Sequence, residues 1–375
     1  MPGFPILDLE RDPPKRLIPW FRSLFGLALG GALGWVLSNE PVFDSVVWIP
    51  VFVISVALHE IGHLAVGKLV GMDPGGIAIC GLVIIRSGAN WRCRFDWRLI
   101  MGGFAKPLPK KSEFDPRRYS WMVAAGPLAT LLLAAISGVA WQWMGKPIGW
   151  VSSFLWVNTS LVILSLLPLS TATDGARLWM LMRNPERARR WMAMLQLMAQ
   201  DSTGVLPRDW NAELMEQILH YDDLAPETAF RQLLGSYRCA DEGNEAGALE
   251  HLEKALAATG SCPRVIRHAV FTDAATAAAL ARGNPVAARR WMARARKERK
   301  PISVHGVEAA LAQSEGRYEG AVRSWDAALA FLAKRKLESG LARFSRRRII
   351  EHREKCLEAI RSAETAGLRA QATGV

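Results

Sequence analysis

The sequence predicts a mainly α-helical, polytopic membrane protein followed by a soluble α-helical domain. Long runs without charged residues occupy the first half of the 375 residues, whereas the second half is rich in Ala, Arg and Glu. An apolar run of about 20 residues is long enough to cross a bilayer as a helix. We therefore expect a cytoplasmic N-terminal segment, a membrane-embedded domain, a helical connector, a helical repeat domain and a flexible tail, at residues 1–17, 18–183, 184–235, 236–365 and 366–375.

About four apolar segments are expected to span the membrane. They cover residues 18–38, 46–70, 119–144 and 148–167, and a broken segment extends the last one to about residue 182. No small-residue cleavage site follows the first run, which indicates a retained anchor and not a removed signal peptide. The chain is thus expected to be a multi-pass integral membrane protein in contact with the lipid bilayer.

The distribution of Lys and Arg predicts the orientation of these spans. Residues 39–45 carry neither residue type, whereas residues 73–118 and the segments outside the first and last spans are basic. Basic loops stay on the cytoplasmic side, so both termini are expected there, and in a bacterium the membrane would be the plasma (inner) membrane. The formal charge of +12 has the same origin, so it does not indicate a nucleic-acid partner.

The long loop is expected to contain a β-hairpin at residues 77–99. The stretch "WRCRFDWRL" alternates apolar and polar residues with the period of a strand, "GIAICGLVIIR" is rich in β-branched residues, and "SGAN" between them is typical of a turn. The edge of such a hairpin can hold an unwound peptide as an added strand.

Three similar stretches in the second half predict helical hairpins. Each places a glycine, Gly243, Gly283 or Gly316, before a helix rich in small residues, and the glycines are 40 and 33 residues apart. Tetratricopeptide repeats have a period near 34 residues. We expect tetratricopeptide-like packing with a protein or peptide partner on its concave surface, with an ordinary Ala-rich bundle as the alternative.

The chemically informative motif is "HEIGH", which lies within the second apolar run. An ionisable residue near the bilayer centre costs about 2.5–3.5 kcal/mol, so His59, Glu60 and His63 need compensation. His59 and His63 are four residues apart and share one helix face, where two imidazoles can hold one zinc ion. Glu60 can then take a proton from a zinc-activated water. The alternative is a pair of histidines hydrogen-bonded inside a helix bundle.

A zinc site of this kind needs a third protein ligand, and Asp174 is the candidate. It is the only acidic residue between 116 and 183, and it follows the helix break at Pro168. Broken backbone at membrane depth is tolerated where it lines a cavity. The alternative is that Asp174 only caps the helix that follows it.

Taken together, "HEIGH", "AAGPLAT" and "LLPLSTATDGARL" resemble the site-2 protease family of intramembrane zinc metalloproteases, over residues 46–182. The resemblance implies that His59, His63 and Asp174 bind one Zn²⁺ per chain, that Glu60 is the catalytic base, and that the substrates are transmembrane proteins. Thr130 and Ser165 stand where the family usually has Asn. Asn158 is a candidate substitute, and a bond to a neighbouring helix is its alternative role.

Two other functions remain open from the sequence. One is a membrane-anchored zinc protease that cuts soluble chains at the cytoplasmic face. The other is a catalytically inactive membrane scaffold that recruits partners through its C-terminal repeats. The complete set of His59, Glu60, His63 and Asp174 favours an active zinc metalloendopeptidase, because a degenerate member is expected to lose Glu60 first.

Overall fold

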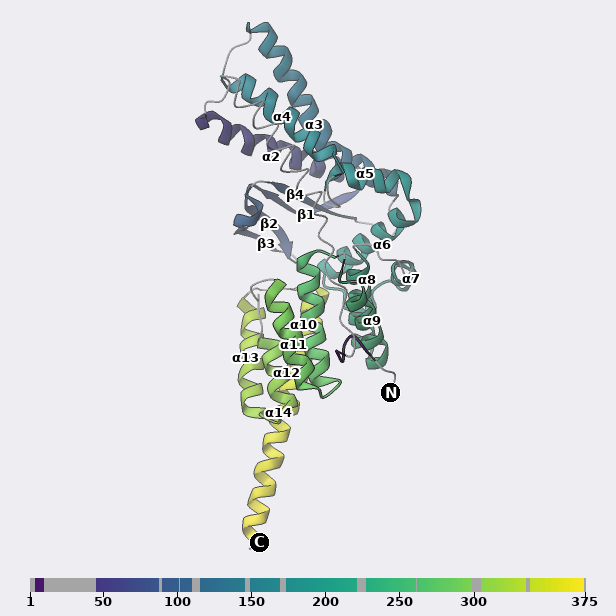
Figure 1. The fold of residues 1–375 in the computed structure, drawn as a ribbon, viewed down its shortest axis with the longest axis vertical. Helices are drawn as coiled ribbons and strands as arrows, with labels where there is room; N and C mark the ends of the chain where they lie inside the picture. Colours follow the sequence, from purple (N-terminus) through teal and green to yellow (C-terminus); the bar gives the residue numbers. More distant parts are fainter. Residues whose placement is uncertain are drawn as a thin grey trace. The chain divides into compact units, whose positions relative to one another are not determined.

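The computed structural model divides into two compact units, residues 18–199 and residues 1–17 with 200–375. The segments that the structure describes are drawn in colour in Figure 1. They are residues 4–9, 45–87, 90–100, 102–109, 115–145, 149–168, 173–220, 227–260, 262–298, 305–334 and 338–373. The predicted first span, 18–38, lies outside them.

Three apolar helices form the core of the first unit (Figure 1). They are α2, Ser45–Leu69, α3, Pro116–Trp143, and α4, Trp150–Leu166, and each contacts the other two. Of the described helices, two are long and apolar enough to cross a membrane, at Val47–Leu69 and Pro116–Trp143. These agree with the predicted second and third spans. The helix at the predicted fourth span has 17 residues, fewer than the roughly 20 that a straight span needs.

Much of the surface of these helices is apolar and exposed. Only 33% and 39% of the two candidate span windows is buried within the chain. The exposed side chains include Ile49, Ile61, Leu69, Leu131, Leu132, Ile136 and Val139. Exposed apolar surface on this scale marks contact with a membrane or a partner.

A four-stranded antiparallel sheet connects α2 to α3. Its strands are β1, Met72–Ile79, β2, Leu82–Ser87, β3, Asn90–Phe95, and β4, Gly103–Pro109, in the order β3-β2-β1-β4. The predicted strand before "SGAN" is therefore two strands, because the chain turns back at Cys80 and Gly81, which have φ of 44° and 91°. The predicted strand residues Trp97–Leu99 instead form a 3-10 turn, η1.

Strand β4 was not predicted from the sequence. Its sequence, GFAKPLP, contains two prolines, which argue against a strand in the middle of a sheet because they lack the backbone N–H. The observed position of β4 at the sheet edge tolerates them. The sequence predicted an isolated two-stranded hairpin, whereas the structure has a four-stranded sheet with β3 and β4 as its outer strands.

Two helices follow the apolar core. Helix α5, Asp174–Arg183, begins after the break near Pro168, and α6, Pro185–Ser202, begins at the next proline. Met192 of α6 packs with Met72 of β1 and with Tyr119, Met122 and Val123 of α3. This small apolar cluster links the sheet to the start of α3.

The described residues of the second unit form helices joined by turns, with no strand among them (Figure 1). Its elements are η2, Pro207–Asp209, α7, Ala212–Leu219, α8, Thr228–Asp241, α9, Glu245–Ala257, α10, Arg264–Leu280, α11, Pro285–Glu298, α12, His305–Ser314, α13, Tyr318–Lys334, and α14, Gly340–Thr373. Helices α8–α9, α10–α11 and α12–α13 form closely packed pairs. Gly243, Gly283 and Gly316 lie in the turns within these pairs with φ of 81°, 58° and 72°, which a side chain would strain. Tetratricopeptide-like packing remains a prediction. Helix α14 continues through residues 366–373, for which the sequence predicted a flexible tail.

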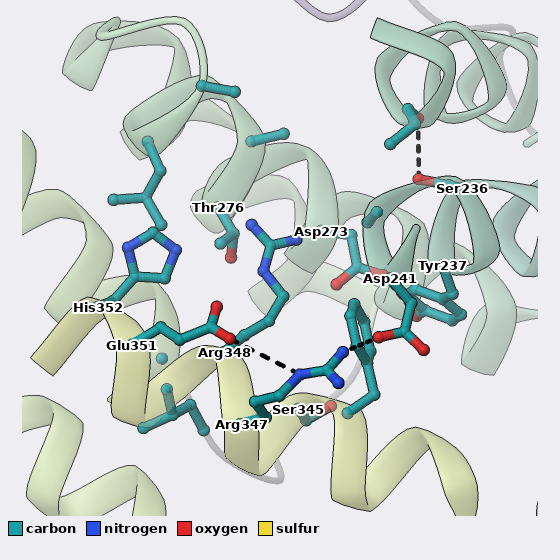
Figure 2. Close-up of a pocket in the computed structure, with 18 of the residues that line it drawn as sticks. Ser236, Tyr237, Asp241, Asp273, Thr276, Ser345, Arg347, Arg348, Glu351 and His352 are labelled. Carbon is teal, nitrogen blue, oxygen red and sulfur yellow. Dashed lines mark hydrogen bonds and ion pairs between the residues drawn. The ribbon is translucent and has the colours of Figure 1, made fainter. Parts of the chain in front are cut away.

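A cavity of about 900 Å³ lies between helices of this second unit. Figure 2 shows the polar groups that line it. Tyr237 of α8 donates a hydrogen bond of 2.6 Å from Oη to Asp273 Oδ2 of α10, and Arg347 of α14 forms an ion pair with Asp241. Burial raises the pKa of the Asp273 carboxyl to about 6.

Candidate metal centre

The two histidines of "HEIGH" lie on one face of α2, one turn apart. His59 and His63 are buried, and their rings meet edge to face with centroids 4.8 Å apart. Their Nε2 atoms are 3.2 Å apart. The uncharged run around the motif forms a continuous helix from Ser45 to Leu69, so the i, i+4 spacing brings the two nitrogens together as the sequence predicted.

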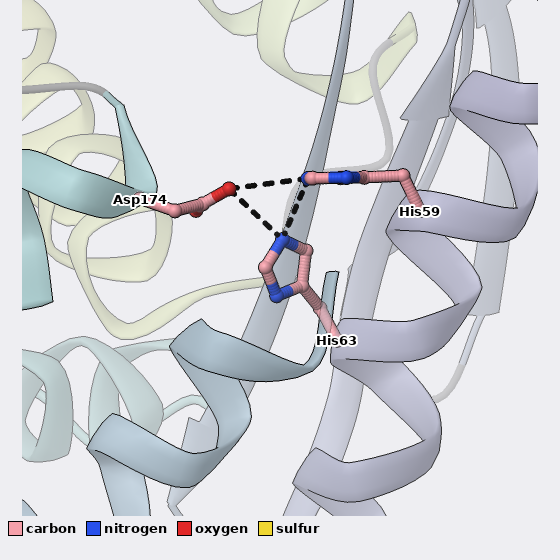
Figure 3. A group of neighbouring side chains, drawn as sticks. All are labelled: His59, His63 and Asp174. Atoms are coloured by element: carbon pink, nitrogen blue, oxygen red, sulfur yellow. Dashed lines mark hydrogen bonds and ion pairs between the residues drawn. The ribbon is translucent and has the colours of Figure 1, made fainter. Parts of the chain in front are cut away.

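Asp174 reaches the same point from α5. Its Oδ2 lies 3.1 Å from His59 Nε2 and 3.5 Å from His63 Nε2. Figure 3 shows the Asp174 side chain pointing toward both rings. The N-cap of α5 is Thr173, whose hydroxyl accepts a hydrogen bond from the Ala176 N–H. The capping role considered for Asp174 is thus taken by its neighbour, and the Asp174 carboxylate is directed at the two imidazoles.

The hydrogen bonds around His63 indicate a cation site. Its Nδ1 lies 2.8 Å from the carbonyl oxygen of Met122, so Nδ1 must carry the proton. In the neutral ring Nε2 is then a lone pair, and it faces the His59 Nε2 and an Asp174 oxygen. Two imidazole nitrogens and a carboxylate oxygen converge in this way. This arrangement is better suited to binding a shared metal ion than to hydrogen bonds among the three groups.

The spacing of these three atoms also fits zinc. Tetrahedral ligands at about 2.0–2.1 Å from a zinc ion are about 3.3 Å from one another. The observed separations of 3.1, 3.2 and 3.5 Å match that value. Among the described residues, His59, His63 and Asp174 form a group that could hold a metal ion, and all three are buried.

Glu60 lies beside this group without joining it. It is 6% exposed, and its Oε2 has no hydrogen-bond partner. Strand β4 passes close to it, because a Cβ added to Gly103 would lie 2.6 Å from Glu60 Oε1. A buried carboxylate with a free oxygen next to a candidate metal site is suitably placed for proton transfer.

Two glycines make room for the centre, and neither was singled out as functional from the sequence. A Cβ on Gly126 of α3 would lie 2.3 Å from His63 Nε2 and 2.7 Å from His59 Nε2. A Cβ on Gly175 would lie 1.7 Å from the carbonyl oxygen of Leu166, where α5 passes the end of α4. In the sequence, Gly126 is marked by the Gly-Pro of "AAGPLAT" and Gly175 by its position directly after Asp174. The reason for Gly126 becomes clear only from the packing of α2 against α3.

The residues at which the sequence departs from the resembled family make local bonds. The Thr130 hydroxyl donates to the carbonyl oxygens of Gly126 and Pro127, and the Ser165 hydroxyl donates to that of Val162. Asn158 Nδ2 donates to Ser55 Oγ of α2 at 3.0 Å. Asn158 therefore makes the helix-to-helix bond that was the alternative to a substrate contact.

One comparison with known proteins finds a match, and the matched segment carries part of this centre. Residues 47–146 match the model of a family described as Peptidase family M50. The matched segment contains His59, Glu60, His63 and Gly126, whereas Asp174 lies beyond it. No curated protein and no solved structure matches the chain.

Proposed function

We propose that this chain is an intramembrane zinc metalloendopeptidase, because residues 47–146 match the model of peptidase family M50. Its proposed substrates are membrane proteins, cut within or next to a transmembrane segment. The observation that carries the proposal is the convergence of Asp174 on His59 and His63 beside the buried Glu60.

In the proposed reaction the side chains have separate roles. His59, His63 and Asp174 hold one zinc ion, which when bound supplies Lewis acidity for peptide hydrolysis. Glu60 accepts the proton of the attacking water and returns it to the leaving amine. The Met122 carbonyl accepts the Nδ1 proton of His63, which orients that ring and leaves Nε2 available as a ligand.

The substrate is proposed to bind as an extended strand along β4. A transmembrane helix hides its peptide bonds in its own hydrogen bonds, so a segment must unwind before it can be cut. Of the two outer strands, β4 is the one whose Gly103 approaches Glu60. An unwound segment added at that edge would place its backbone near the proposed base. The hairpin of residues 77–99, which contributes β3 as the other outer strand, was the candidate from the sequence for this role, and the proximity of Gly103 to Glu60 favours β4 over it.

The membrane arrangement is also part of the proposal. The apolar α2 and α3 are proposed to cross the membrane, with α4 and residues 18–38 as further spans and both termini cytoplasmic. The exposed apolar side chains of α2 and α3 support a lipid-facing position. They favour this arrangement over a soluble catalytic domain that is only anchored to the membrane, and the retention of Glu60 disfavours the inactive scaffold.

The decisive experiment compares the wild type with Glu60→Gln in cells. The amide cannot accept the proton, so turnover should fall by about 10²–10⁴-fold. At least one membrane protein should then accumulate uncut in the variant alone. Since Glu60 is not among the three ligands, the purified variant should keep the zinc content of the wild type. Identical cleavage patterns of all membrane proteins in the two strains would rule out the proposed activity.

A further inference from the structure

The N-terminal segment, residues 4–9, is bound by the helical unit. Leu7 is completely buried, and Phe4 is 5% exposed. Both side chains belong to the apolar cluster that contains Leu252 of α9 and Trp291 of α11. The segment has no helix or strand of its own, only turns closed by the hydrogen bonds Asp8 N–H to Phe4 O and Leu9 N–H to Ile6 O.

The helical unit recognises the backbone of this segment. The Glu253 carboxylate accepts hydrogen bonds from the N–H groups of Ile6 and Leu7, at 2.7 and 2.8 Å. Trp291 Nε1 donates to the carbonyl oxygen of Leu7 at 2.8 Å. Three consecutive polar contacts to main-chain atoms are the kind of interaction by which a receptor holds a peptide in a fixed register.

An ion pair recognises Asp8, the residue after Leu7. Arg282, in the bend after α10, forms an ion pair of 2.9 Å between Nη2 and Asp8 Oδ2. The same guanidinium carbon lies 5.6 Å from the centre of the Phe4 ring. Arg282 therefore contacts both ends of the recognised segment, the aromatic residue and the acidic one four positions later.

We propose that Glu253, Arg282 and Trp291, which contact residues 4–9, form a peptide-binding groove, and that residues 4–9 are its resident ligand. The site takes a short segment with one apolar residue, a second apolar residue three positions later, and an acidic residue directly after that. The resident segment is exchangeable, so the vacated groove binds a peptide of the same pattern in trans.

The test uses the full chain in detergent and a fluorescein-labelled peptide with the sequence of residues 2–10. The acceptor is a variant that lacks residues 2–9, and binding is followed by fluorescence anisotropy. The peptide should saturate this variant and bind the wild type at least tenfold more weakly, because the wild-type groove is occupied. A labelled peptide carrying Leu7→Asp should bind neither protein, since Leu7 is fully buried in the bound segment.

Charge exchange tests the specific contact. Adding Arg282→Glu to the deletion variant should weaken binding of the peptide at least tenfold, and a peptide carrying Asp8→Lys should restore it. Arg323→Glu on α13, at an exposed position outside the groove, is the matched control and should leave binding unchanged. A folded deletion variant that binds the original and Leu7→Asp peptides equally would overturn the proposal.

A second measurement applies if the deletion variant does not fold. A protease recognition sequence inserted after Arg11 allows the folded full chain to be cut between the resident segment and the rest. An exchangeable ligand is then replaced by excess labelled peptide, at a rate that Arg282→Glu increases. A cut protein that keeps its original segment against the excess peptide contradicts exchange and makes residues 4–9 a fixed part of the fold.

Discussion

Asp174 Oδ2 lies 3.1 Å from His59 Nε2 although 115 residues separate the two in the chain. His59 is on the long apolar helix α2, and Asp174 is the first residue of the short helix α5. The contact is buried, so it places a carboxylate and two imidazoles in surroundings where unpaired polar atoms are costly. A bound cation would stabilise this group.

Removing the Asp174 charge should reduce metal binding. In Asp174→Asn the side chain keeps its size, but a neutral amide replaces the carboxylate ligand. Zinc content, measured by mass spectrometry after purification without chelators, should fall from about one per chain to a small fraction, since zinc sites depend on a full ligand set. Asp209→Asn, at an exposed position, serves as the control. Full zinc occupancy in Asp174→Asn would exclude Asp174 as a ligand.

Gly126→Ala should damage the same centre by steric means. The added methyl group would lie 2.3 Å from His63 Nε2, which is too close for any carbon, so the imidazole must move. Zinc affinity should fall by roughly 10–100-fold, the range seen when metal ligands lose their orientation. Gly138→Ala on the same helix is the matched control, because its Cβ would meet only Leu155 Cδ1 at 3.5 Å. Equal affinities of the two variants would show that α3 does not constrain the imidazoles.

Gly103→Ala should separate metal binding from catalysis. Its Cβ would lie 2.6 Å from Glu60 Oε1 and 2.7 Å from the Ala78 carbonyl oxygen, so Glu60 or β4 must shift. Peptide cleavage should fall by about 10²-fold, because proton transfer requires close geometry, while zinc content stays near that of the wild type. Gly102→Ala is the control, since a Cβ there meets nothing within 4 Å. Unchanged cleavage in Gly103→Ala would argue against Glu60 as the general base and against β4 as the strand that binds the substrate.

Two titratable groups that line the cavity of the helical unit, Asp273 and His352, should change the stability of the folded state with pH in opposite directions (Figure 2). The pKa of Asp273 is raised from 3.8 to about 6, mainly by burial, so its protonated form is favoured in the folded state. Its contribution to stability is greatest below about pH 3.8 and is lost as the pH rises through 6. The pKa of His352 is lowered from 6.5 to about 4, by burial and then by Arg348 and Lys355. Its contribution is present above pH 6.5 and is lost as the pH falls through 4.

Single variants should separate these two effects between pH 4 and 6.5. In Asp273→Asn, His352 is the only one of the two groups that still titrates. The protection of α10 against hydrogen exchange, corrected for the intrinsic exchange rate, should therefore rise with pH more steeply than in the wild type. His352→Gln leaves the carboxyl, so protection should fall as the pH rises. The wild type should lie between the two. Parallel curves for all three proteins would mean that neither group titrates in this range.

Local patterns in the sequence were sufficient for the elements that depend on a few neighbouring residues. Uncharged runs predicted α2 and α3, because the helix is the local structure that satisfies its own backbone in an apolar environment. The spacing of "HEIGH" predicted that His59 and His63 share a face, because four residues make about one helical turn. Gly243, Gly283 and Gly316 predicted turns, because glycine adopts positive φ without strain.

Apart from the meeting of Asp174 with the two histidines, which the motifs led us to expect, only the tertiary structure decided which distant segments meet. Strand β4 was not predicted because its sequence contains two prolines. Its place at the sheet edge depends on pairing with β1, more than 20 residues earlier in the chain. The importance of Gly126 follows from how closely α3 approaches the imidazoles, and the binding of residues 4–9 follows from Glu253, Arg282 and Trp291 being adjacent. By itself the sequence determined the helices, the turns and the chemistry of the motif. The sheet edge, the fit around the candidate metal centre and the proposed peptide groove depend on packing between distant segments, for which no local periodicity exists.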